Sequence, residues 1–300
     1  MKKFLLPLLC CLTLHTATAQ KNKALPDFKK IENAILEDGQ RLYQMEMATR
    51  LGVEIFTNDL YDLHAKTAGY FPYKDGKLFK CVFYNKLAEA EIVATISFDS
   101  TFNAQNEVVN TTLRPMNWLE KDLYKMNEHA LDDIKRDTTF YKFYTNTTTS
   151  LLPFVDKNHR SIYVITKSLD PTTVIFGNDY QIDFDNAGYI ASRRVLHDSL
   201  ITMETSSKDP YADESMEAVT HRHSAGTGEF MTPTDVCTIM LNQKKSRWQH
   251  QVVIGPNYVS VWYCDVNEIQ TITKKEWYKF NKSDDPDLEK EKPVAVGKKH

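Results

Sequence analysis

The residues best suited to chemistry lie between Glu217 and Asp235, where two histidines are separated by one residue. We predict a strand over Ala218–His223, in which side chains alternate, so that His221 and His223 share one face. Two imidazoles at positions i and i+2 of one face can chelate a single metal ion through ring nitrogens about 2 Å from it. The pattern therefore predicts a metal site on this strand, although both residues could also be ordinary core or surface histidines.

A third ligand is available at the start of the next predicted helix, Pro233–Leu241, for which Thr232 is a suitable N-cap. A Gly-rich loop of eight residues separates the histidines from this helix start. The loop can fold back and bring the Asp235 carboxylate to the same ion. The resulting His₂Asp set leaves the fourth position open to water, which separates a catalytic zinc ion from a closed structural one.

This pattern resembles the JAMM (MPN-plus) metalloprotease motif, in which His-x-His-Pro is followed after about seven residues by Ser-x-x-Asp. The resemblance covers residues 160–275 and implies a mixed α/β domain with zinc bound by His221, His223 and Asp235. It further implies that Thr232 replaces the serine whose hydroxyl helps to hold the oxyanion. Two positions depart from the motif, since Ser224 replaces the proline and the spacer is one residue longer.

The motif also requires a general base, which this chain does not supply in the usual form. The family places a glutamate about 45–55 residues before the first histidine, but no Glu lies between Glu128 and Glu204. Asp170, 51 residues before His221, is the acid that we assign to this role. The remaining acids that could serve instead are Glu204, Glu214 and Glu217.

His197 follows a predicted strand over residues 189–195 and leaves two interpretations open. It can be a third imidazole ligand, giving a His₃ or His₃Asp site, or a hydrogen-bonded structural histidine, which is the more common role. The site as a whole likewise has two interpretations. The first is a zinc hydrolase that cleaves an amide or isopeptide bond in a peptide, cell-wall or secreted protein substrate. The second is a non-catalytic envelope or secreted binding protein that keeps a JAMM-like fold.

The first 19 residues predict a cleavable secretory signal. A basic start at Lys2 and Lys3 precedes an apolar run over residues 4–14, and the small residues Ala17 and Ala19 precede the expected cleavage point. The run is shorter than the roughly 20 apolar residues that span a bilayer, so we predict no transmembrane anchor. We expect the mature protein to be periplasmic or secreted.

The net charge narrows the class of partner, and the cysteine count leaves two interpretations open. Without its signal, the chain has 35 basic and 40 acidic residues, a net charge of about −5 that argues against nucleic acid as a partner. A peptide or a cell-wall fragment is the partner that the exported location suggests. Three cysteines remain, and either Cys237 and Cys264 form a disulfide or all three, with Cys81, are buried thiols.

The spacing of apolar residues predicts an α+β fold with mixed, mostly antiparallel sheets and a few flanking helices. Residues 27–50 have helical spacing interrupted at Gly39, which predicts two short helices or one kinked helix. A hairpin around Gly76, a strand over 91–98 and an amphipathic helix over 118–134 follow. The polar stretch 145–150 divides an N-terminal region, 20–150, from a β-rich, JAMM-like region, 151–282, and 283–300 is a charged tail.

The whole chain also resembles a set of uncharacterised exported proteins of Gram-negative bacteria. The resemblance rests on a GNDY segment at 177–180, the His-rich strand, the TPTD helix start and a VSVW strand at 259–262. It implies a family unit but no activity.

Overall fold

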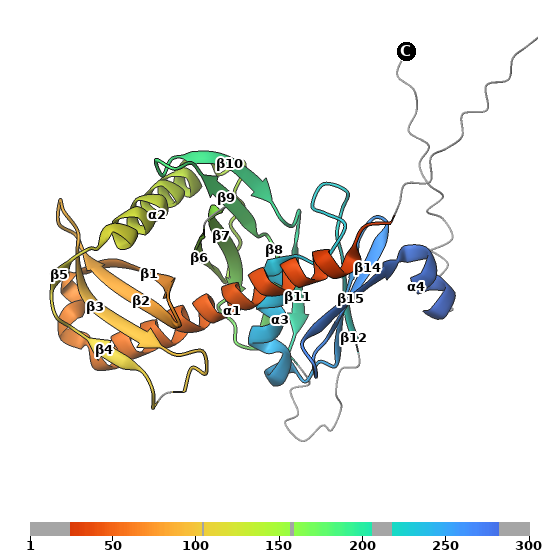
Figure 1. Cartoon of the computed structure of the whole chain (residues 1–300), viewed down its shortest axis with the longest axis horizontal. Helices are drawn as coiled ribbons and strands as arrows, with labels where there is room; N and C mark the ends of the chain where they lie inside the picture. The colour runs from red at the N-terminus through yellow and green to blue at the C-terminus, as the bar shows by residue number, and fades with distance from the viewer. Residues whose placement is uncertain (1–24, 104, 157–158, 206–217, 282–300) are drawn as a thin grey trace, which may run out of the picture.

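One long helix, α1 (Phe28–Asp59), runs along most of the molecule in the computed structural model (Figure 1). The structure describes residues 25–103, 105–156, 159–205 and 218–281. The predicted signal, the charged tail, Glu214 and Glu217 lie outside these residues. Within them, no helix combines the length and apolar content needed to cross a membrane.

The predicted α+β class is confirmed. The other helical segments are η1 (Tyr61–Lys66), α2 (Trp118–Arg136), α3 (Pro233–Ser246) and α4 (Lys274–Asn281). The first sheet contains β1 (Thr67–Asp75), β2 (Leu78–Asn85), β3 (Glu91–Phe98), β4 (Val108–Asn110) and β5 (Arg114–Pro115). The second contains, in spatial order, β10 (Ile190–Val195), β9 (Tyr180–Phe184), β7 (Arg160–Ser168) and β6 (Thr147–Val155).

A pair of strands, β8 (Thr173–Gly177) and β11 (Leu200–Glu204), leads to the last sheet. That sheet contains β12 (Ala218–Arg222), β13 (His250–Ile254), β14 (Tyr258–Tyr263) and β15 (Glu268–Thr273). Neighbouring strands are antiparallel in every described pair except β12 and β13, which are parallel. The first and last sheets lie toward opposite ends of α1 (Figure 1).

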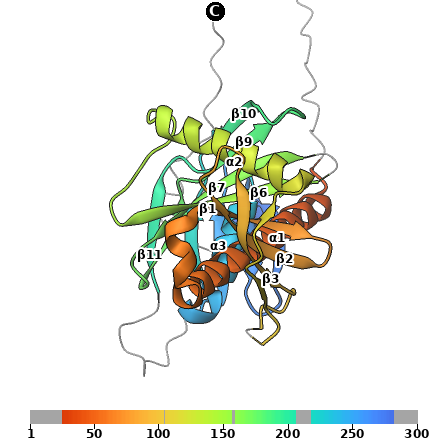
Figure 2. The same ribbon diagram turned by 90° about the vertical axis from the view of Figure 1, so that its left-hand side faces the viewer.

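The second sheet lies between α2 and α1, as Figure 2 shows from the end that carries the first sheet. Side-chain alternation along β7 explains this layering. Ile162 and Val164 pack in one core cluster with residues of α2, whereas Tyr163 and Ile165 pack in another with residues of α1. Each face of this strand is therefore apolar, as expected for a sheet covered on both sides.

Of the two forms predicted for this region, two short helices is wrong, because α1 is a single helix of 32 residues that runs through Gly39. The glycine instead permits close packing against α3. A Cβ atom at Gly39 would lie 2.4 Å from Cβ of Val236 and 3.1 Å from the carbonyl oxygen of Pro233. The loss of helix propensity, about 1 kcal/mol, is thus offset by the close approach of two helices.

The polar stretch 145–150 is largely a strand, since β6 begins at Thr147 and pairs with β7. Threonine favours strands because of its branched Cβ atom. The division at residue 150 stays a prediction about folding units. In the structure, one core cluster contains Leu42 of α1, Leu152 of β6 and Cys237 of α3.

No disulfide joins Cys237 and Cys264, and Cys81 is also a free thiol. The predicted pair lies in different core clusters, with Cys237 fully buried beside α1 and Cys264 at the edge of the cluster around Trp262. Burial raises the pKa of the Cys237 thiol well above its usual value, and raises that of Cys264 to about 11. Both side chains therefore act as apolar groups in the fold.

Packing at Gly39 gives a test of the helix contact. We expect Gly39→Ala to lower the free energy of unfolding by about 1–2 kcal/mol, because overpacking outweighs the gain in helix propensity. Urea denaturation measures the change, and in the double variant with Val236→Gly, which removes the contacting Cβ atom, the loss should be smaller than the sum of the two single losses. Greater stability of the single variant would contradict the close contact.

Candidate metal centre

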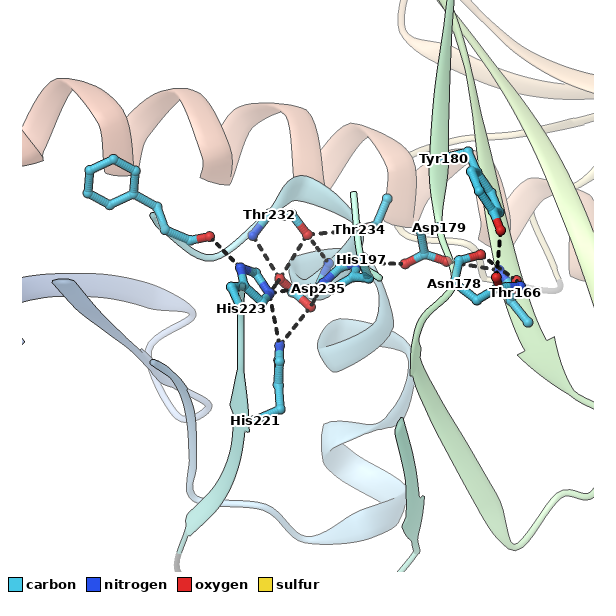
Figure 3. Close-up of polar contacts among 11 residues, drawn as sticks. Thr166, Asn178, Asp179, Tyr180, His197, His221, His223, Thr232, Thr234 and Asp235 are labelled. Atoms are coloured by element: carbon cyan, nitrogen blue, oxygen red, sulfur yellow. Dashed lines mark hydrogen bonds and ion pairs between the residues drawn. The ribbon is translucent and has the colours of Figure 1, made fainter. Parts of the chain in front are cut away.

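Four side chains that can bind a metal ion converge between α3 and the last sheet (Figure 3). His221 comes from β12, His223 follows that strand, Asp235 lies in the first turn of α3, and His197 follows β10. One potential ligand atom from each lies within 4.8 Å of the others. This group can hold a metal ion.

The two strand histidines meet as the alternation predicts. Along β12, Val219 and His221 are buried while their neighbours are exposed, and His223 is buried on the same face. Parallel pairing places His221 opposite Val253 of β13, and the His223 amide extends the ladder by donating to the carbonyl of Ile254. The sheet backbone therefore fixes both imidazoles.

Asp235 is positioned by the cap of its own helix. The Asp235 amide donates to Thr232 Oγ1 at 3.1 Å, while the Thr232 amide and hydroxyl both donate to Asp235 Oδ2 at 2.8 Å. These contacts form a capping box, which satisfies otherwise unpaired amides at a helix start. Thr232 thus holds one carboxylate oxygen and leaves Oδ1 directed toward the histidines.

Four of the six distances between the ligand atoms are close to those between the corners of a four-coordinate site. His197 Nε2 lies 3.0 Å from His223 Nε2, which is 3.3 Å from His221 Nε2. Asp235 Oδ1 lies 3.1 Å from His197 Nε2 and 3.2 Å from His221 Nε2. Ligand atoms of a tetrahedral ion with bonds of about 2.0 Å are separated by about 3.3 Å.

The unpaired atoms of the group also fit a metal ion. Asp235 Oδ1 is buried, and Nε2 of His197 at 3.1 Å and Nε2 of His221 at 3.2 Å can donate to it only when they carry a proton. Exposure of the side chains is 3% for His197 and 0% for His221, His223 and Asp235. A buried carboxylate oxygen without a donor is costly, and a cation among these four atoms removes that cost.

Contacts behind two histidines hold their Nε2 atoms toward the centre. Nδ1 of His223 lies 3.0 Å from the carbonyl oxygen of Phe230, which can only accept, so the ring proton resides on Nδ1. Nδ1 of His197 faces Asp179 Oδ2 at 3.5 Å. The Asp179 carboxylate is itself buried and accepts a hydrogen bond from the Thr166 amide. Carboxylate–histidine–metal arrangements of this kind orient metal ligands in proteins.

The GNDY turn between β8 and β9 explains the position of Asp179. Gly177 has φ +93°, and a Cβ atom there would lie 2.1 Å from the carbonyl oxygen of Ser199. Asn178, also at positive φ, donates to the carbonyl of Lys142 and accepts from the Tyr180 hydroxyl. The turn thereby directs Asp179 toward His197 (Figure 3).

A side-chain hydrogen bond also joins the segments that carry His197 and His223. Each histidine is followed by a polar residue, and the Ser224 hydroxyl donates to the Asp198 carboxylate. Ser224 is the residue that stands in place of the motif's proline. Its hydroxyl therefore links the β10–β11 connection to the end of β12.

Asp170, the predicted general base, is not part of this group. It lies in the turn between β7 and β8, where its carboxylate accepts from Thr172 and Thr173, and these hydrogen bonds lower its pKa. The ligand-bearing end of β8 is the opposite one, at Gly177. Glu204 ends β11 and is likewise outside the group.

Two members of the site were not predicted with these roles. The sequence left open whether His197 is a metal ligand or a structural histidine, and the structure brings it into the group. Asp179 was part of a segment noted only for its resemblance. The signal available in sequence was an acid directly after a Gly-Asn turn, since such turns fix the direction of the next side chain.

Comparisons with known proteins add no family to this description. No protein-family model, curated protein or solved structure matches the chain. The resemblance to the JAMM motif therefore stays a prediction.

The charges of the group predict how metal binding depends on pH. Burial alone would lower the pKa of His197, but Asp235 and Asp179 raise it to about 10. Burial alone would raise the pKa of Asp235, but His197 and His221 hold it well below its usual value. The metal-free group is therefore protonated at His197 at neutral pH, and a metal ion must displace that proton.

We expect metal affinity to rise at least about tenfold per pH unit between pH 7 and 9, because one proton leaves for each ion bound. Competition with a chelator of known affinity measures the slope. The raised pKa of His197 lies above this range, so the rise should not level off within it. A flat profile would contradict displacement of a proton from His197.

Asp179 provides a second test. We expect Asp179→Asn to weaken metal binding by about 10–100-fold, because the neutral amide no longer orients and polarises His197. Asp183→Asn is the control, since Asp183 binds Ser161 and Ser192 in the second sheet, away from the metal group. Equal affinity of wild type and Asp179→Asn would remove Asp179 from the metal centre.

Proposed function

We propose that this chain is an exported, zinc-dependent binding protein in which the ion holds the fold and does not catalyse a reaction. The observation that carries the proposal is the fourth ligand position, which His197 fills. Structural zinc sites are four-coordinate and closed, whereas catalytic sites keep one position for water or substrate. Burial of all four ligand side chains supports the same conclusion.

Three imidazole nitrogens and one carboxylate oxygen, with four of their six separations at 3.0–3.3 Å, support zinc as the ion. When bound, zinc would join three elements that are distant in sequence. His197 lies in the β10–β11 connection, His221 and His223 lie at the end of β12, and Asp235 lies in α3. The ion would therefore stabilise the last sheet against the helix layer.

The hydrolase predicted from the JAMM resemblance has less support from the residues around the group. It needs an open ligand position, a base near the bound water and a free hydroxyl for the oxyanion. His197 stands at the open position, Asp170 is elsewhere, and Thr232 is engaged with Asp235 in the cap. Each of these three facts favours a non-catalytic role.

We place this binding role outside the cytoplasm, because the first 19 residues predict export. The ligands available there include peptides and cell-wall fragments. The acidic balance of the chain continues to argue against nucleic acid.

Metal content and stability test this proposal together. We expect the full chain to bind about one equivalent of zinc, and removal of zinc to cost about 2.7 kcal/mol relative to protein with free zinc at 100 times Kd. His221→Ala should lose the zinc and be as unstable as the stripped protein. Elemental analysis and urea denaturation measure both quantities.

His159→Ala is the matched control, because the His159 side chain is 66% exposed and outside the group. Less than about a tenth of an equivalent in wild type after zinc loading would contradict a metal centre of this affinity. Zinc-dependent cleavage of peptide amides, abolished by His221→Ala, would contradict the non-catalytic role.

A further inference from the structure

A cavity of about 440 Å³ lies between α1, α3 and the β7–β8 turn, on the side of α3 that faces α1. Figure 1 shows these elements meeting near the middle of the molecule. The volume is within the range of about 300–1,000 Å³ that is usual for small-molecule sites. The cavity is separate from the metal group, none of whose four ligands lines it.

Three basic side chains line the cavity: Arg50 of α1, Lys167 of β7 and Lys245 of α3. The Lys167 ammonium pairs with the buried carboxylate of Glu46, and the Lys245 ammonium donates to the carbonyl of Pro171. Arg50 is exposed and forms no hydrogen bond or ion pair with the described residues. The acids of the lining are Glu46 and Asp170, so the three basic side chains exceed the carboxylates by one.

Asp170 forms no ion pair with Arg50, because its carboxylate accepts from Thr172 and Thr173 and the ammonium that acts on it is that of Lys245. The Glu46 carboxylate is likewise held by Lys167. Of the three cations that line the cavity, Arg50 is thus the one that no described protein group engages. A planar, forked donor of this kind matches a carboxylate by two parallel hydrogen bonds.

The remaining lining is suited to an apolar body. Ile165, Val174 and Leu241 contribute aliphatic side chains from three different elements. Apolar walls with a few fixed polar groups are the usual composition of a small-molecule site. The lining therefore selects a molecule that combines one anionic group with an aliphatic or aromatic part.

The cavity shares its walls with the metal centre. Thr166 lines it, and the Thr166 amide donates to the Asp179 carboxylate that faces His197. Thr238, another lining residue, lies three residues after the ligand Asp235 on α3. A metal ion that fixes α3 and the GNDY turn would fix two walls of the cavity as well.

We propose that this cavity binds a carboxylate attached to an apolar body, with Arg50 pairing with the carboxylate; this assignment rests on the non-catalytic binding role proposed above. The C-terminus of a short peptide and a free organic acid share this chemistry. The apolar part lies against Ile165, Val174 and Leu241. The carboxylate end lies toward the rim, where Arg50 is exposed.

The test uses matched probes on the zinc-loaded full chain: N-acetyl-leucyl-leucine, its C-terminal amide, and octanoate. Saturation-transfer NMR titrations give the dissociation constants. We expect the peptide acid or octanoate to bind at least about tenfold more tightly than the neutral amide, because only the carboxylates form a charge-assisted pair. The tighter of the two acids identifies the source of the ligand.

Arg50→Gln should abolish this preference, whereas Arg136→Gln, at the exposed end of α2, should preserve it. Equal binding of acid and amide, an unchanged preference in Arg50→Gln, or no binding of either acid at about 10 mM would overturn the proposal. Zinc content and unfolding midpoint are measured on the same samples. Normal zinc content with no acid binding rejects the cavity assignment alone, whereas absent zinc rejects the metal centre.

Discussion

The fold must stabilise one carboxylate and three imidazoles that are buried together, away from solvent. In four of the six pairs their ligand atoms lie 3.0–3.3 Å apart, while the side chains are almost fully buried. Buried ionisable groups are expensive unless they are paired, protonated or bound to a metal. A proton on His197 meets this requirement in the metal-free protein, and a metal ion would meet it with four ligand bonds in place of one charged contact.

The surrounding fold supplies the precision that such a group requires. Asp235 is held by a capping box, the strand histidines by sheet pairing, and His197 by a carboxylate at the end of a tight turn. Gly39 lets α1 lie directly against the start of α3, beside the residue that follows Asp235. Backbone elements therefore position the metal group, and flexible side chains contribute little to it.

Local patterns were sufficient to predict the parts of the site that depend on local geometry. His221 and His223 share a face because strands alternate, and Asp235 follows Thr232 by the spacing of a capping box. The hairpin at Gly76, the strand over 91–98 and α2 were equally visible, since their apolar periods are regular. These features require no knowledge of distant segments.

The other parts depend on long-range packing that a single sequence does not encode visibly. His197 and Asp179 reach the centre only because β9, β10 and the β8–β11 pair are arranged around it. Asp170 was assigned by its separation from His221 along the chain, but the intervening strands carry it to the far end of β8. Gly39 was taken for an interruption of the helix, a break or a kink, because its packing partner, Val236, lies 197 residues away.

The same packing relates the metal centre to the cavity beneath α1. The Thr166 amide donates to the Asp179 carboxylate, and Thr166 also lines the cavity. A closed metal site would keep these walls in place without taking part in chemistry. This division of roles accounts for a site that is buried and a neighbouring cavity that is accessible.

The central claim, a closed four-ligand centre, is tested most directly by a crystal structure of the zinc-loaded protein with anomalous data at the zinc edge. The account predicts one ion bound by Nε2 of His197, His221 and His223 and by Oδ1 of Asp235, at about 2.0–2.2 Å and without a bound water. An ion held by two histidines, Asp235 and a water, with His197 turned away, would contradict it.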